Sequence, residues 1–132
     1  MPWVEIFAVF VVSHLVGDFL LQTDWQAKHK HGGLGRDPVA RRALISHVTT
    51  YTLAFVPAFI WLGPHLDADL IAVVALVALP HLVQDDGRLL AVYVRRVKHT
   101  ADRPSELLSV AVDQSFHMVV LLLVALLAGA WT

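Results

Sequence analysis

Four long apolar segments fill most of this chain, and they restrict its fold more than any other feature. A helix needs about 20 apolar residues to cross the hydrocarbon core of a bilayer. Segments of that length run from about Pro2 to Thr23, Ala43 to Leu62, Ala68 to Asp86 and Ser105 to Trp131. The chain is 57% hydrophobic and 16% charged, so it has more apolar surface than a soluble core of its size can bury. We therefore predict an all-α, single-domain polytopic membrane protein over residues 1–132, a bundle of four transmembrane helices.

Charge and cysteine content exclude several classes of protein. The formal net charge is −1 and there is no cysteine. The chain therefore has no overall basic balance of the kind that nucleic-acid binding needs, and it cannot form disulfides, iron–sulfur clusters or thiolate zinc sites. The first apolar segment is too long for a cleavable signal peptide, and Gln22-Thr23-Asp24 follows it instead of a small-residue cleavage site. We expect this segment to remain as a helix.

The basic residues are confined to two of the three connections between the apolar segments. They are Lys28, Lys30, Arg36, Arg41 and Arg42 in and around the first, and Arg88, Arg95, Arg96, Lys98 and Arg103 in the third. The positive-inside rule assigns such connections to the cytoplasm, and the tryptophans near the expected helix ends fit the membrane interfaces. The sequence thus predicts that both termini are external. The Arg88–Lys98 stretch mixes Leu and Val with basic residues, which fits an extension of the third helix, an amphipathic segment on the inner leaflet, or a solvated helix end.

Polar residues recur at helical spacing within these apolar segments. They are His14, Asp18 and Gln22 in the first, His47 in the second, His81 and Asp85 in the third, and Asp113, Gln114 and His117 in the fourth. Residues four apart share one face of a helix, so three of the segments carry a His–Asp ridge. The remaining histidines fall in connections and are expected to be solvated. Ionisable side chains inside a membrane are costly, and they usually face the bundle interior at a functional site.

The order within each His–Asp pair indicates that the ridges meet at one depth. His precedes Asp in the two segments that run inward, at His14/Asp18 and His81/Asp85, whereas Asp113 precedes His117 in the outward fourth segment. The reversal cancels the change of direction, and each His lies about 6 Å deeper than its Asp, given a rise of ~1.5 Å per residue. His47 is expected near the Asp level, at the edge of the cluster. The matching strings HLVGD and HLVQD at these two inward pairs also suggest an internal repeat.

Imidazole and carboxylate ligands together suit a divalent metal, with zinc favoured and manganese or iron as alternatives. Metal sites in helical bundles are built from side chains at this spacing on facing helices. The predicted ligands are His14, Asp18, His81, Asp85, Asp113 and His117, and Gln22 and Gln114 are expected to orient them. This set exceeds what one tetrahedral zinc needs, so it predicts either two metals or additional orienting residues. A haem site is disfavoured because haem ligation has no use for three carboxylates.

The same residues resemble a known family. His14-x3-Asp18-Phe19-x2-Gln22, Trp25, Lys28, His47, His81-x3-Asp85 and Asp113-Gln114-x2-His117 resemble small bacterial membrane proteins grouped as domain of unknown function 3307. The resemblance covers most of the chain and implies a bacterial inner-membrane protein. It implies no activity. At one position the chain departs from the family pattern. The pattern leads us to expect a bulky apolar or aromatic residue there, whereas this chain has Asp86. The chain is also similar in outline to membrane-bound proteins labelled metal-dependent hydrolases, an analogy at the level of the fold.

The favoured function is metal-dependent hydrolysis of an amphipathic or lipid-linked substrate at the inner leaflet. His47 or Asp113 would act as general base, and the basic connections would attract anionic headgroups of membrane lipids. Two other functions stay open, a proton- or metal-ion transporter that uses the same cluster, and a structural membrane subunit. The substrate, the identity and number of metals, and a homo-oligomeric state also stay open.

Overall fold

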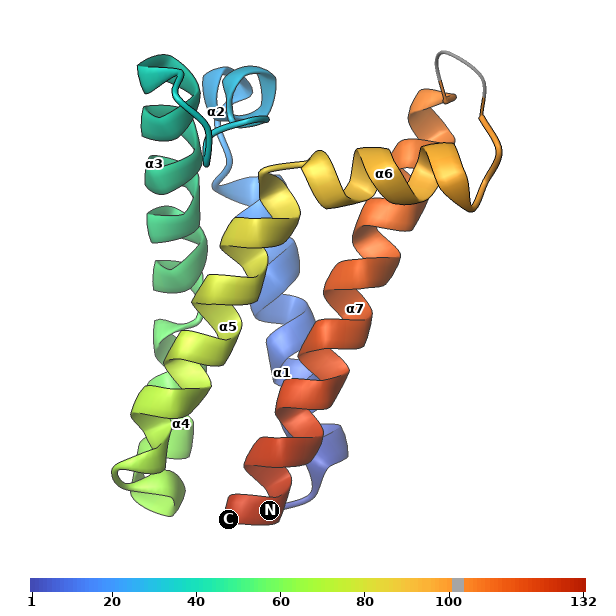
Figure 1. The fold of residues 1–132 in the computed structure, drawn as a ribbon. Coiled ribbons are helices and arrows are strands. Elements are labelled where there is room, and N and C mark those ends of the chain that lie inside the picture. Colours follow the sequence, from blue (N-terminus) through green and yellow to red (C-terminus); the bar gives the residue numbers. More distant parts are fainter. Residues whose placement is uncertain (101–103) are drawn as a thin grey trace.

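All secondary structure in the described residues is helical, which confirms the predicted all-α class (Figure 1). The computed structural model describes residues 1–100 and 104–132, so Arg103 of the third connection lies outside the described residues. The helices are α1 (Trp3–Leu15), the π-helix η1 (Val16–Leu20), α2 (Asp24–His29), α3 (Pro38–Ala54), α4 (Val56–Leu66), α5 (Asp69–Asp85), α6 (Arg88–Arg96) and α7 (Glu106–Trp131).

Two continuous helical segments are long and apolar enough to cross a membrane. They are Trp3–Leu20, formed by α1 and η1, and α7. The pair α3 and α4 is bent by 58° and the pair α5 and α6 by 61°, and the count rises to four if each bent pair is one span. The fold is therefore compatible with a membrane location, with two to four spans by length and composition.

The second apolar segment forms two helices, α3 and α4, where one helix was predicted, and α4 extends beyond the predicted end of the segment. The sequence predicted an end near Leu62, but α4 runs on through Gly63 and Pro64 to Leu66. The break lies instead at Phe55, just before Pro57 in the first turn of α4. Proline removes a backbone donor and clashes with the preceding turn, so it favours a new helix start here. The backbone turns at Asp67, whose φ is +46°.

The third segment ends near its predicted boundary. Helix α5 stops at Asp85, and Gly87 then adopts a left-handed conformation with φ of +80°. This glycine turns the chain sharply into α6, which lies across the end of the bundle (Figure 1). The Arg88–Lys98 stretch therefore forms mainly a separate amphipathic helix, not a straight extension of α5.

The half of the bundle near the termini has an apolar interior. Helix α1 packs along α7, and α5 packs against α3 and α7. The buried side chains there include Ile6, Phe10, Phe55, Leu62 and Leu121. The two chain ends lie together, with Met1 N donating to Thr132 Oγ1 at 2.6 Å (Figure 1).

Many large apolar side chains point away from this interior. Ile71 is 77% exposed, Ile60 is 71% exposed and Val12 is 62% exposed. Soluble monomers rarely leave such residues exposed in continuous patches. A surface of this kind is compatible with contact with a membrane or with another protein.

In the half of the molecule away from the termini, η1 packs closely against α3. A side chain at Gly17 would place its Cβ 2.7 Å from Cδ2 of Tyr51 and 3.2 Å from its Cα, so only glycine fits without movement. The π-helix begins one residue earlier, at Val16, and carries Asp18. Single π-turns often occur at functional sites, and this one presents Asp18 to the bundle interior.

Candidate metal centre

Four helical segments bring a compact group of imidazoles and carboxylates into the interior. Six side chains in this group are no more than 6% exposed: His14, Asp18, His47, His81, Asp85 and His117. They come from α1, η1, α3, α5 and α7. The structure thus places five of the six residues of the predicted His–Asp ridges in the interior, and the sixth, Asp113, at its rim.

Asp18, His81, Asp85 and His117 form a group that could share one metal ion. Each can offer one ligand atom, and these four atoms lie within 4.8 Å of one another. Asp85 is central, because its Oδ1 lies 3.1 Å from His117 Nε2 and its Oδ2 lies 3.3 Å from His81 Nε2. Asp18 Oδ1 also approaches His81 Nε2, to 3.4 Å. This buried group could hold a metal ion.

His47 lies at the centre of the group, although it was expected at the edge. Its Nε2 is 2.8 Å from Asp85 Oδ2, 3.2 Å from Asp18 Oδ1 and 3.1 Å from His81 Nε2. Helix α3 begins at Pro38, earlier than the expected start of the second span, so His47 lies deeper along its helix than the sequence indicated. It supplies a third imidazole within reach of the same point.

Unsatisfied polar atoms show that these residues fit a cation. Asp18 Oδ1 and His117 Nε2 are buried and have no hydrogen-bond partner among the described residues. The Nδ1 of His117 lies 2.8 Å from the carbonyl oxygen of Asp113. This contact requires the proton on Nδ1, so in the neutral ring Nε2 presents a lone pair toward Asp85 Oδ1. Two lone-pair atoms 3.1 Å apart repel each other unless a positive charge lies between or beside them, and either a proton on Nε2 or a divalent cation would supply it.

His14 lies beside this group with both ring nitrogens engaged. Gln114 directs its amide nitrogen toward two carboxylates, at 3.5 Å from Asp18 Oδ2 and 3.2 Å from Asp113 Oδ2. Its Oε1 therefore accepts from His14 Nε2 at 2.8 Å, and His14 Nδ1 accepts from the Tyr51 hydroxyl at 3.1 Å. His14 was predicted to be a ligand, but these partners suit an orienting role. Gln114, which was predicted to orient the ligands, contacts His14 and two carboxylates.

Tyr51 was missed in the sequence because an isolated tyrosine in an apolar helix carries no periodic signal. Besides holding His14, its ring stacks on His81, with ring centroids 3.4 Å apart and planes inclined by 3°. Tyr51 is therefore in contact with two histidines of the group and limits the rotation of both. Its spacing from His47, one helical turn away on α3, is the only sequence feature that pointed to it.

Lys30 was also missed, because it was counted among the basic residues of the first connection. The chain after α2 folds back, and Lys30 Nζ reaches both Asp85 Oδ2 and Gln22 Oε1 at 2.6 Å. The lysine side chain is only 12% exposed. Gln22 therefore orients this lysine and makes no described contact with a histidine. The ammonium group neutralises part of the charge of the two buried carboxylates.

Asp113 lies at the rim of the group. Its Oδ2 is 3.7 Å from His117 Nδ1, on the side of the ring that faces away from Asp85, and its side chain is 26% exposed. It was predicted both as a ligand and as a catalytic base. Its greater exposure and outer position suit proton transfer better than metal binding.

Asp86, where the family resemblance led us to expect an apolar side chain, supports the first connection. The Leu34 amide donates to Asp86 Oδ1 at 2.8 Å, and the Gly32 amide donates to the Asp86 carbonyl oxygen at 2.8 Å. Arg88 Nε lies 2.9 Å from Asp86 Oδ2. This carboxylate therefore fixes the chain that carries Lys30, and has no contact with the histidines.

These features define a small all-α protein with a buried His–Asp centre shared by its long helices. The chain belongs to the family described as Protein of unknown function (DUF3307), whose sequence model matches residues 6–132. The family resemblance of the site residues is thereby confirmed over nearly the whole chain. No curated protein matches it, and no solved structure matches it.

Proposed function

We propose that this protein spans the inner membrane of a bacterium four times and holds a divalent metal within its bundle. The bent pair α3–α4 is one span, and α5 is another, with α6 lying at the interface. The apolar outer surface of the bundle supports this arrangement. So does the distribution of charge, since α2, the start of α3 and α6 carry basic residues at the end opposite the termini (Figure 1).

Thiol labelling from outside intact cells tests this orientation. A cysteine in place of His65, near the C-terminal end of α4, is expected to react, whereas a cysteine in place of Leu34, which is 48% exposed in the first connection, is expected to react only after permeabilisation. Neither substitution creates a second thiol, because the chain has no cysteine. Reaction at position 34 but not at position 65 in intact cells would reverse the proposed topology.

The metal ligands in this proposal are Asp18, His47, His81, Asp85 and His117. Convergence of these buried donors, with four of their atoms lacking hydrogen-bond partners among the described residues, is the observation that carries the proposal. Two carboxylates balance the charge of one divalent cation, which lowers the cost of keeping it in a medium of low polarity. Nitrogen and oxygen donors without thiolate favour zinc, with manganese and iron as alternatives.

The proposed activity is metal-dependent hydrolysis of an amphipathic or lipid-linked substrate at the inner leaflet. A divalent ion with such ligands acts as a Lewis acid and activates water when an open position remains. Asp113, at the partly exposed rim, is placed to accept a proton. The apolar interior on the side of the termini, with Phe10, Phe55 and Leu62, favours an enzyme over a transporter, because it offers no polar route onward from the cluster.

Two measurements on protein purified in detergent test the proposal. Elemental analysis is expected to find zinc, or another divalent transition metal, near one per chain. Incubation with inner-membrane lipid extract is expected to give hydrolysis products by mass spectrometry, and a chelator or Asp113→Ala is expected to abolish them. Metal or proton flux in proteoliposomes without lipid turnover would assign the cluster to transport. Firmly bound metal with neither activity would leave a structural role.

A further inference from the structure

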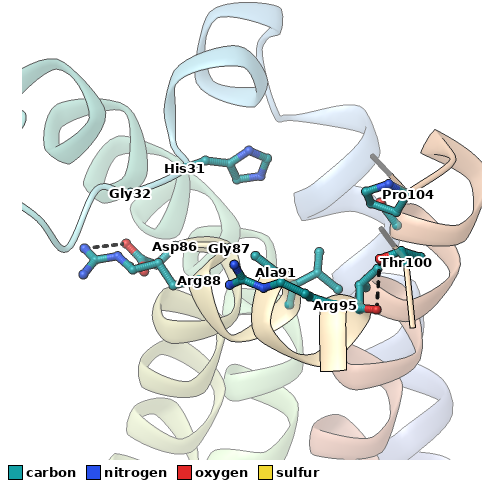
Figure 2. A pocket seen from close by; sticks show the side chains of 12 residues that line it. His31, Gly32, Asp86, Gly87, Arg88, Ala91, Arg95, Thr100 and Pro104 are labelled. Carbon is teal, nitrogen blue, oxygen red and sulfur yellow. Dashed lines mark hydrogen bonds and ion pairs between the residues drawn. The ribbon is translucent and has the colours of Figure 1, made fainter. Parts of the chain in front are cut away.

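A cavity opens between α6 and the chain that follows α2 (Figure 2). Its volume is about 780 Å³. The residues of its wall that matter here are His31, Gly87, Arg88, Ala91, Val94 and Arg95. None of them belongs to the His–Asp centre, so the cavity is a separate feature of the molecule.

The wall of this cavity carries an excess of positive charge. Arg95 extends over the Gly87–Ala91 turn of α6, and His31 lies across from it (Figure 2). Asp86 is the only acidic residue among the described residues of the wall, and Arg88 and the Leu34 amide already satisfy it. Arg95 has no acidic partner within 4 Å in the described part of the chain. The cavity therefore suits an anion.

The cavity also has an apolar side. Leu90, Ala91 and Val94 line it from α6. Other apolar side chains of the same helix point away from the cavity, with Leu89 59% exposed and Val92 41% exposed. A helix that is apolar along one side and basic along another lies at the boundary between headgroups and acyl chains. An occupant with both an anionic and an apolar part fits this position.

Two short stretches of chain connect the cavity to the His–Asp centre. Lys30 reaches Asp85 while the next residue, His31, lines the cavity. Asp85 binds the histidines while the next residue, Asp86, lines the cavity, and the Gly32 amide joins the two stretches by donating to the Asp86 carbonyl oxygen. An occupant would therefore lie beside the residues that hold the proposed metal.

We infer that this cavity binds the phosphate group of an anionic amphiphile. The inference deepens the proposed function, on which it rests for the membrane placement of α6 and for the class of substrate. The planar guanidinium of Arg95 suits two parallel hydrogen bonds to phosphate oxygens. His31 adds donor capacity, and the apolar residues of α6 contact the start of the acyl chain. Phosphate recognition next to the metal centre identifies the substrate as a phosphate-bearing lipid.

Binding of lysophosphatidic acid to the full-length protein in an uncharged detergent tests this inference. Isothermal titration calorimetry is expected to show saturable binding, whereas monoolein, which lacks the phosphate, is expected not to bind. Arg95→Gln is expected to weaken binding by about tenfold or more, as loss of a hydrogen bond between charged groups predicts. Arg96→Gln removes the same charge from the same helix, but Arg96 does not line the cavity, so a change below about twofold is expected.

Three other outcomes would each contradict a specific part of the inference. Equal weakening by the Arg95 and Arg96 variants would mean diffuse attraction to a basic surface and would refute the site. Binding of inorganic phosphate as tight as that of the amphiphile would assign the cavity to a soluble anion. Elemental analysis of the same samples separates the two proposals. If lysophosphatidic acid does not bind but the metal is retained, only the cavity site is refuted. If no metal is found but lysophosphatidic acid still binds, only the metal centre is refuted.

Discussion

Asp85→Asn is expected to lower the affinity for the bound metal by at least about a hundredfold. Asp85 contacts three imidazoles of the centre, with His117 on one oxygen and His47 and His81 on the other. The amide keeps the shape of the side chain but removes its charge, so one of the two carboxylates that balance a divalent cation is lost. Breaking a buried charge pair costs about 3–5 kcal/mol, and every ~1.4 kcal/mol is tenfold in affinity.

Two neighbouring acids provide matched controls. Asp86→Asn changes the next residue, which is equally buried but contacts only Arg88 and the Leu34 region. Asp113→Asn changes the carboxylate at the rim. In both variants the metal affinity is expected to stay within about tenfold of wild type, because the loss of a residue that only orients a ligand costs about tenfold at the least. Chelator competition followed by elemental analysis measures all three. Equal loss in the Asp85 and Asp113 variants would place the metal nearer the rim.

The meeting of the three ridges follows from helix periodicity and direction alone. A spacing of four residues on one face, with the order of His and Asp reversed in the outward helix, is enough to bring the three His–Asp ridges to similar depth. These features depend only on the geometry of straight helices. For the same reason the sequence also indicated the all-α class and the approximate extent of α5 and α7.

The parts that sequence analysis missed depend on irregular backbone. Lys30 joins the centre because the chain after α2 folds back and Asp86 fixes it there. The π-helix at Val16–Leu20 and the bend at Phe55 change the direction of side chains that a straight helix would place elsewhere. Hydrophobic periodicity carries no signal for such features. The distinction between ligand and orienting histidine likewise needs hydrogen-bond partners, as His14 shows.

Lys30→Met is expected to change metal affinity and metal-free stability in opposite directions. Lys30 Nζ occupies the same oxygen of Asp85 that His47 approaches, and the side chain is almost entirely buried. The ammonium repels a divalent cation bound at the centre, so its removal is expected to tighten metal binding by at least about tenfold. Without metal, the same change removes the positive charge that balances the buried Asp85 carboxylate, which lowers the free energy of unfolding by about 3 kcal/mol.

Lys28→Met provides the control for this variant. It makes the same substitution two residues earlier and causes the same change in net charge, but Lys28 is an exposed partner of Asp24, with 67% of its side chain accessible. Exposed ion pairs contribute little, so both measurements are expected to stay near wild type. Chelator competition gives the affinity, and thermal unfolding of chelator-treated protein gives the stability. Weaker metal binding in Lys30→Met would mean that the lysine holds Asp85 in position for the metal instead of competing with it. Tighter binding together with a lower melting temperature would identify the ammonium as a built-in counterion for the empty centre.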